Sequence, residues 1–266
     1  MIIDSHAHVS NRWYEPVESL LAQMVRNGVD AAVLVQLLGH YDNQYLIDCV
    51  RRYPGQFACV ALVDCRADDV HDVLDSLAAQ GVRGIRLRPT DQSPGTDPLA
   101  IWKQAAELGL VVSCVGNEKT FLSPEFASVL DAVPAVQVVL EHLGGTSSAP
   151  QTDEELAQRR LVFGLARYTN VFMKVPGLGE IVPRKTLDMP VAQAVPVPQA
   201  PLLTEALAQF GASRLMWGSD FPVVSSREGY TFARQWVAAA LSDKIDAAGI
   251  NLLFGGTAKR LFFDSP

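Results

Sequence analysis

The sequence predicts an α/β protein of the (β/α)8 TIM-barrel class, folded as a single domain over residues 1–266. Short apolar, β-branched runs recur along the chain, a segment of helical periodicity follows each run, and there are eight runs. Near-continuous apolar strands are typical of a parallel sheet covered on both faces, and strict alternation of strand with helix requires right-handed crossovers. Eight such units close naturally into a barrel.

The predicted strands are residues 2–4, 31–36, 57–63, 84–89, 110–115, 136–142, 170–175 and 214–219. Two intervening helices are clearest. In residues 15–28, Pro16 suits the first helical turn and Gly28 the C-terminal stop. Residues 68–81 carry an apolar stripe that ends at Gly81. An open, doubly wound sheet is the alternative, but neither GxGxxG nor GxxxxGK[ST] follows an early strand.

Composition and charge limit the classes of partner. The chain has 266 residues, 48% hydrophobic content, a formal charge of −7 and a pI near 5.2. This charge offers no general attraction to nucleic acid or anionic lipid. No apolar run approaches the ~20 residues of a spanning helix, and no signal peptide is visible. We expect a cytoplasmic enzyme that acts on a small molecule, either alone or as a homo-oligomer.

The four cysteines form no CxxC pair, which argues against a disulfide framework or a cysteine zinc cluster. Six prolines lie between residues 176 and 201, just after the seventh predicted strand. This density excludes a helix interior. Because barrels carry their chemistry at the carboxyl ends of the strands, we interpret 176–201 as a loop over the mouth. A disordered insertion is the alternative interpretation.

Histidines follow the first predicted strand in the stretch "MIIDSHAHV". Residues two apart in an extended segment point the same way, so His6 and His8 present two imidazoles to one metal ion or one substrate. Alone, an HxH pair fits a structural role equally well.

Polar residues also end later strands. Arg86 and Arg88 lie two apart in an apolar run, so at least one must point inward, toward a substrate or into a buried ion pair. His142 stands before two glycines, which would let the backbone approach a ligand. Lys174 ends the seventh run, and Asp220 lies between a Gly-Ser turn and a proline. If the barrel is right, these groups converge on one opening.

The stretches "IDSHAH", "VVLEHLGG", "NVFMKVPGL" and "LMWGSDFPV" resemble the amidohydrolase superfamily. More narrowly, they resemble amidohydrolase family 2, which includes sugar-lactone hydrolases, pyrone-dicarboxylate lactonase and a decarboxylase group. The resemblance spans nearly the whole chain and implies the same barrel. It implies that His6, His8 and Asp220 contact a metal ion or the reacting atoms. It also implies that His142 is a ligand or substrate contact, and that Arg86 contacts a substrate carbonyl or carboxylate.

The fifth strand departs from that family pattern. Many metal-dependent members have a histidine there, whereas this chain reads "VVSCVGNEKTF", and no Lys or Glu of the carbamate type is evident on strand four. The departure argues against a binuclear centre and against the decarboxylase group. One divalent ion, zinc or manganese, held by His6, His8 and Asp220 is one expectation; metal-free catalysis, as in some lactonases of the branch, is the other.

The predicted function is therefore hydrolysis of a lactone of a sugar acid or dicarboxylic acid. Asp220 is expected to activate water as general base, and Arg86, His142, His6 and His8 to stabilise the oxyanion. Further substrate contacts are expected from Arg88, Asn117, Lys119, Lys174 and His40. The alternatives are a lactone isomerase, an amide or ester hydrolase and a non-catalytic barrel that binds a sugar acid. Which lactone fits depends on the loops around Trp13, Tyr14, His40 and Tyr41 and on the proline-rich segment.

Overall fold

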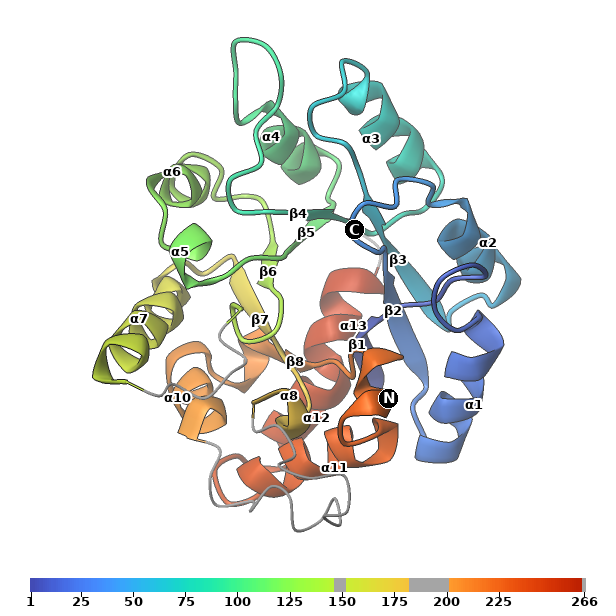
Figure 1. The fold of residues 1–266 in the computed structure, drawn as a ribbon, viewed down its shortest axis with the longest axis vertical. Coiled ribbons are helices and arrows are strands. Elements are labelled where there is room, and N and C mark those ends of the chain that lie inside the picture. Colours follow the sequence, from blue (N-terminus) through green and yellow to red (C-terminus); the bar gives the residue numbers. More distant parts are fainter. Residues whose placement is uncertain (146–151, 182–200, 265–266) are drawn as a thin grey trace.

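A computed structural model describes residues 1–145, 152–181 and 201–264. Eight parallel strands form one sheet in chain order, which confirms the predicted (β/α)8 barrel. Figure 1 shows the strands in the middle of the molecule with helices arranged around them. The strands are β1 (Ile3–Ala7), β2 (Ala31–Val35), β3 (Phe57–Leu62), β4 (Gly84–Leu87), β5 (Val111–Cys114), β6 (Val138–Leu140), β7 (Val171–Val175) and β8 (Leu215–Trp217).

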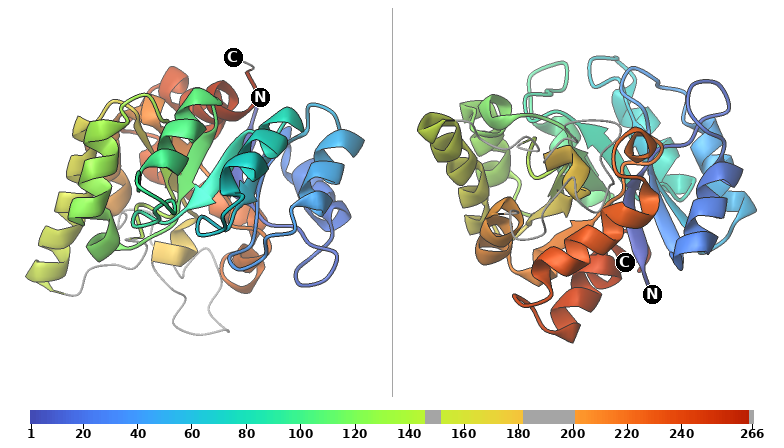
Figure 2. Two further views of the ribbon diagram at one scale, coloured as in Figure 1. Left: turned by 90° about the horizontal axis from the view of Figure 1, so that it is seen from above. Right: turned by 60° about the horizontal axis from the view of Figure 1, so that its bottom comes forward.

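Amphipathic helices connect the strands and cover the outside of the barrel; the views in Figure 2 show those of the N-terminal half side by side around the sheet. The helices are α1 (Val17–Asn27), α2 (Gln44–Arg52), α3 (Val70–Ala79), α4 (Ala100–Glu107), α5 (Glu118–Phe121), α6 (Pro124–Ala132), α7 (Asp153–Phe163), α8 (Leu178–Ile181), α10 (Pro201–Phe210), α11 (Tyr230–Leu241), α12 (Ala247–Asn251) and α13 (Thr257–Phe262). Short 3₁₀ turns are η1 (Gly164–Arg167), η3 (Ala212–Arg214) and η4 (Val223–Ser226), and η5 (Leu252–Gly256) is a π-helical turn.

The residues that the sequence indicated as helix ends lie at or next to the observed ends of α1. Pro16 is the N-cap of α1, one residue before its first helical position, and Gly28 ends the helix in the left-handed conformation with φ of 62°. Glycine adopts this conformation without the steric cost that a Cβ brings. No helix among residues 1–145, 152–181 and 201–264 is long and apolar enough to cross a bilayer.

The barrel interior has an apolar layer and, above it, a polar layer. Val111, Val139 and Phe172 belong to the apolar cluster inside the barrel. Ala258 and Phe262 of α13 are part of the same cluster, at the end of the barrel where the strands begin. Because side chains alternate along a strand, the residue two positions later also faces inward. At those later positions the chain has Ser113, Glu141 and Lys174, all of them buried. The polar layer therefore lies under the mouth of the barrel.

The sheet closes between β1 and the segment that follows β8. Ala7 and Phe221 form a parallel bridge, and the Asp220 amide donates to the His6 carbonyl at 2.8 Å. The buried carboxylate of Asp4 reinforces this seam by accepting from the Ser219 amide, the Ser219 hydroxyl and the Tyr230 hydroxyl. The closure thus fixes the backbone of His6 beside that of Asp220.

The proline-rich segment is described only in part. After β7 the chain enters α8, which brings Glu180 to the barrel mouth. The predicted covering loop, 176–201, falls mostly on residues 182–200, which lie outside the described residues.

Candidate active site

A cavity of about 420 Å³ opens at the carboxyl ends of the strands. This is the end at which barrel enzymes carry their active sites. Several predicted site residues line it, together with apolar residues from the loops after β1 and β2. The lining residues are His8, Trp13, Tyr14, Leu37, Leu38, Gly39, His40, Arg86, His142, Asp220 and Val223.

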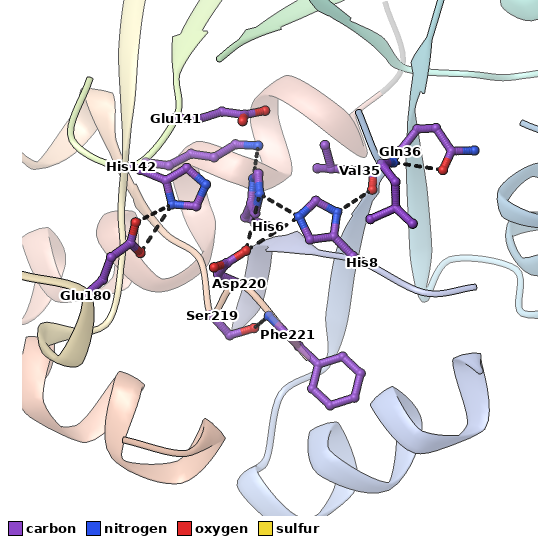
Figure 3. A network of polar contacts seen from close by, with 12 residues as sticks. His6, His8, Val35, Gln36, Glu141, His142, Glu180, Ser219, Asp220 and Phe221 are labelled. Carbon is purple, nitrogen blue, oxygen red and sulfur yellow. Dashed lines mark hydrogen bonds and ion pairs between the residues drawn. The ribbon is translucent and has the colours of Figure 1, made fainter. Parts of the chain in front are cut away.

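His6, His8 and Asp220 meet beside this cavity (Figure 3). The Nε2 atoms of the two histidines are 3.2 Å apart. Oδ1 of Asp220 lies 3.5 Å from His8 Nε2 and 3.8 Å from His6 Nε2. The spacing of two residues therefore does point both imidazoles the same way, toward the carboxylate of Asp220, which follows β8.

The outer ring nitrogens of the two histidines have different partners. His8 Nδ1 lies 2.7 Å from the carbonyl of Val35 and donates its proton there, while its Nε2 faces Asp220. His6 Nδ1 lies 2.9 Å from Nζ of Lys174. Burial lowers the pKa of Lys174 to about 8, against the pull of the Glu141 carboxylate. Burial, together with the charge of Lys174, holds the pKa of His6 well below its usual value.

Backbone strain marks the two site residues that follow β6 and β8. His142 has a φ of 50° and Asp220 a φ of 59°, in the left-handed region that non-glycine residues rarely occupy. Space is tight here as well: a Cβ at Gly218 would lie 2.6 Å from Cβ of His6. The seam holds the backbone of Asp220, and the amide of Leu143, which donates to the Lys174 carbonyl at 2.9 Å, ties the backbone beside His142 to β7.

His142 pairs with a carboxylate that sequence reasoning missed. Its Nδ1 lies 3.0 and 3.2 Å from the two carboxylate oxygens of Glu180, on α8 (Figure 3). Burial by itself lowers the pKa of His142, but the carboxylate of Glu180, together with those of Asp220 and Glu141, outweighs it and raises the pKa above its usual value. No pattern in the sequence marks Glu180, because it lies on a four-residue helix in the proline-rich stretch, where no helix was predicted.

Asp220 has a cationic neighbour that was also missed. Nη1 of Arg227 lies 3.2 Å from Oδ2 of Asp220 and 3.6 Å from Glu180. Burial by itself raises the pKa of Asp220, but the hydrogen bond to His8 and the charges of His142 and Arg227 outweigh it and hold the pKa below its usual value. Asp220 is thus ionised at neutral pH.

Arg86 lines the cavity and also forms a buried ion pair, so it combines the two interpretations that the sequence left open. Its Nη2 lies 2.7 Å from a Glu141 oxygen, its Nε contacts the same carboxylate, and its Nη1 donates to the Gln36 carbonyl. Ser113 also donates to Glu141 at 2.7 Å. A buried acid directly before His142 in an apolar run was the signal that could have identified Glu141.

Of the other predicted substrate contacts, the structure brings His40 to the cavity but not Arg88, Asn117, Lys119 or Lys174. Arg88 is exposed because β4 ends at Leu87, so the inward alternation stops before it. The Asn117 side chain caps α5, and Lys119 is exposed on the same helix. Lys174 lies beneath His6 rather than on the cavity wall, whereas His40 does line the cavity.

The two glycines after His142 serve a different purpose from the predicted approach to a ligand. Gly144 and Gly145 have φ values of 70° and 73°. A Cβ at Gly145 would lie 2.1 Å from the carbonyl oxygen of Gly116. The close approach is therefore between the loops that follow β5 and β6.

The residues beside the cavity can hold one divalent ion. His6, His8 and Asp220 each offer one ligand atom, and these atoms lie within 4.8 Å of one another. The bond from His8 Nδ1 to a backbone carbonyl is the outer arrangement usual for a metal-binding histidine. His6 can offer Nε2 when its proton is on Nδ1, and Nζ of Lys174 must then be a neutral amine that accepts the Nδ1–H hydrogen bond.

Comparison with known proteins places the chain in a family. The sequence matches the amidohydrolase family over residues 3–263. The chain belongs to that family. It is 28% identical over 222 residues to an L-fucono-1,5-lactonase of Burkholderia ambifaria, a match that covers 79% of this chain and 69% of that protein. It is 24% identical over 212 residues to a 4-sulfomuconolactone hydrolase of Rhizobium radiobacter, covering 78% and 66%.

Solved structures of amidohydrolases share the fold. A zinc-bound amidohydrolase of Burkholderia multivorans superposes with a TM-score of 0.77 at 24% identity and 98% coverage of both chains. A Pseudomonas putida protein provisionally named 2-pyrone-4,6-dicarboxylic acid hydrolase gives 0.74 at 25% identity, covering 98% of this chain and 97% of that one. A 5-carboxyvanillate decarboxylase of Sphingomonas paucimobilis gives 0.64 at 14% identity with 99% coverage of both, which shows the shared fold alone.

Proposed function

We propose that this amidohydrolase opens a lactone by hydrolysis, with Asp220 as general base. The observation that carries the proposal is that one cavity contains two groups, Asp220 and His142, whose surroundings move their pKa values in opposite directions. The pKa of Asp220 lies below its usual value and that of His142 above it. At one pH, therefore, the same cavity offers a carboxylate to accept a proton and an imidazolium to donate one.

The reaction begins with water beside Asp220 and the lactone carbonyl toward Arg86 and His142. The water oxygen attacks the carbonyl carbon while its proton passes to Asp220. The negative charge that develops on the carbonyl oxygen is stabilised by the free N–H groups of Arg86 and by His142, donors already fixed by Glu141 and Glu180. The bond from the carbonyl carbon to the ring oxygen then breaks, and the ring oxygen takes the proton that Asp220 accepted from water, which restores the Asp220 carboxylate. The product is a hydroxy acid, which releases one proton to neutral solution.

The remaining residues fix the positions of these groups. Lys174 and Val35 orient the rings of His6 and His8. Arg227 holds the Asp220 carboxylate from the side away from the histidines. A divalent ion held by His6, His8 and Asp220, when bound, would polarise the carbonyl oxygen or lower the pKa of a bound water.

The two curated relatives support the reaction class, because both are named for opening a lactone. A small-molecule substrate agrees with the dimensions of the cavity. A cytoplasmic location, the absence of nucleic-acid partners and the oligomeric state stay predictions from the sequence.

Acid release tests the proposal. The purified protein is incubated with a panel of aldonic and dicarboxylic-acid lactones in weak buffer with a pH indicator. Enzyme-dependent acid release is the expected result. Consumption of lactone without acid release would assign an isomerase instead, and failure to consume any lactone would overturn the proposal.

A further inference from the structure

One wall of the cavity is apolar and comes from two loops. Trp13 and Tyr14 follow β1, and Leu37 and Leu38 follow β2; all four line the cavity. The Tyr14 ring lies 6.0 Å from the ring of His8, centroid to centroid. The apolar wall therefore begins about one ring width from the groups assigned to catalysis.

These side chains are unusually exposed for their type. Trp13 is 80% exposed, Leu38 46% and Tyr14 40%. The other three tryptophans, Trp102, Trp217 and Trp236, are buried. A contiguous apolar patch on the wall of a cavity is characteristic of a binding surface.

The charges around the cavity are balanced rather than strongly positive. The guanidinium of Arg86 is paired with Glu141, and the imidazole of His142 with Glu180. Asp220 adds a negative charge to the lining, and Arg88 and Lys119 lie elsewhere. Among the described residues, the cavity thus offers the polar groups of Arg86, His142, His8 and His40 for a carbonyl or carboxylate, and an apolar surface for what is attached to it.

Resting on the proposed function, we infer that the preferred substrate is a lactone with an apolar substituent, alkyl or aryl, rather than a polyhydroxylated or dicarboxylic lactone. The carbonyl lies toward Arg86, His142 and Asp220, and the substituent lies against Trp13, Tyr14 and Leu38. Hydroxyl groups directed at Leu37 and Leu38 would lose hydration without gaining hydrogen-bond partners from these side chains.

Three lactones with the same six-membered ring test the inference. They are δ-valerolactone without a substituent, δ-decalactone with a pentyl chain, and D-glucono-δ-lactone with hydroxyl groups. We expect kcat/KM for δ-decalactone to exceed that for δ-valerolactone at least about tenfold, because several methylenes leave water on binding. A higher kcat/KM for the glucono-lactone than for δ-decalactone would overturn the inference.

A matched pair of leucine variants locates the effect. Leu38 is 46% exposed on the cavity wall, and Leu161 is 55% exposed on α7, outside it. Leu38→Ala should lower the ratio of kcat/KM between δ-decalactone and δ-valerolactone about three- to tenfold, whereas Leu161→Ala should leave this ratio as it is. An unchanged ratio in Leu38→Ala would contradict the assignment of the wall.

Fluorescence separates this inference from the proposed function. As the exposed tryptophan, Trp13 dominates quenching by acrylamide. The ring-opened acid 5-hydroxydecanoate should protect the protein from quenching, gluconate at the same concentration should not, and Trp13→Phe should remove the effect. If no lactone is hydrolysed but this protection is seen, the proposed function fails and the apolar wall stands. Equal protection by both acids, or by neither, would overturn the wall itself.

Discussion

Glu180 and His142 form an ion pair at the barrel mouth, with 3.0 Å between a carboxylate oxygen and Nδ1. They come from α8 and from the end of β6, 38 residues apart in the chain. The pair leaves Nε2 of His142 as the ring's second donor when the imidazole is protonated. The carboxylate of Glu180 therefore favours the protonated form of the half-buried His142, which can donate a hydrogen bond to an oxyanion.

Replacing Glu180 by Gln should shift the alkaline limb of the pH profile. Glu180 raises the pKa of His142, so its loss lowers that pKa and the imidazolium disappears at a lower pH. The alkaline limb of kcat/KM for lactone hydrolysis should move to lower pH, with activity on the acid side of the limb largely kept. Glu205→Gln, which changes a remote carboxylate near Arg160, is the matched control. A limb that stays in place in Glu180→Gln would remove Glu180 from this role.

Replacing Glu141 by Gln should destabilise the fold. The change leaves Arg86 buried without its counter-ion, a loss of about 3–5 kcal/mol in the free energy of unfolding. Burial by itself raises the pKa of Glu141, but the charges of Arg86 and Lys174 outweigh it and hold the pKa well below the usual 4.5. Its contribution is therefore fully present above about pH 4.5 and is lost as the pH falls through the lower, folded-state value.

Denaturant titrations of wild type and Glu141→Gln at pH 7 and at progressively lower pH measure this contribution. The difference in unfolding free energy should be constant at neutral pH and should narrow below pH 4.5. A difference that grows as the solution becomes more acidic would contradict the buried ion pair.

Tyr230→Phe should weaken the seam between β1 and β8. It removes a buried hydrogen bond of 2.9 Å to the Asp4 carboxylate, worth about 1.5–3 kcal/mol for a charged acceptor. Tyr168→Phe removes the corresponding bond to Asp131 at the surface, and it should cost less than about 0.5 kcal/mol. Equal losses of unfolding free energy in the two variants would show that the bond from Tyr230 to Asp4 does not stabilise the seam.

Zinc binding tests the ligand set independently of activity. Titration calorimetry of the metal-stripped protein with Zn²⁺ should show one site, and His8→Ala should weaken it by at least about 100-fold because one of three ligands is lost. His40→Ala is the matched control, since His40 lines the cavity but lies outside the His6, His8 and Asp220 cluster. Equal weakening in both variants would place the ion elsewhere.

The barrel could be predicted from the sequence because its strands and helices carry local signals. Apolar runs and a helix stop such as Gly28 depend on neighbouring residues alone. Convergence of His6, His8, His142 and Asp220 followed from the topology, since parallel strands in a barrel end at one face. These inferences needed no knowledge of distances.

The partners of these residues could not be predicted in the same way. Glu180 reaches the site from the short helix α8 and Arg227 from the end of η4, and Arg88 turns outward because β4 ends one residue earlier. Whether Asn117 binds substrate or caps a helix depends on where α5 begins. The orientation and partners of these side chains depend on tertiary packing, which a local sequence pattern does not contain.

The most direct test of the account is acid release by Asp220→Asn on a lactone that the wild type hydrolyses. Asparagine keeps the size of the side chain but cannot accept the proton of water, so kcat should fall about 10²–10⁴-fold. Thermal unfolding should show that the variant is folded, and Asp243→Asn, at an exposed surface position, should keep full activity. Near-normal turnover by a folded Asp220→Asn protein would contradict the central claim that this carboxylate activates the water.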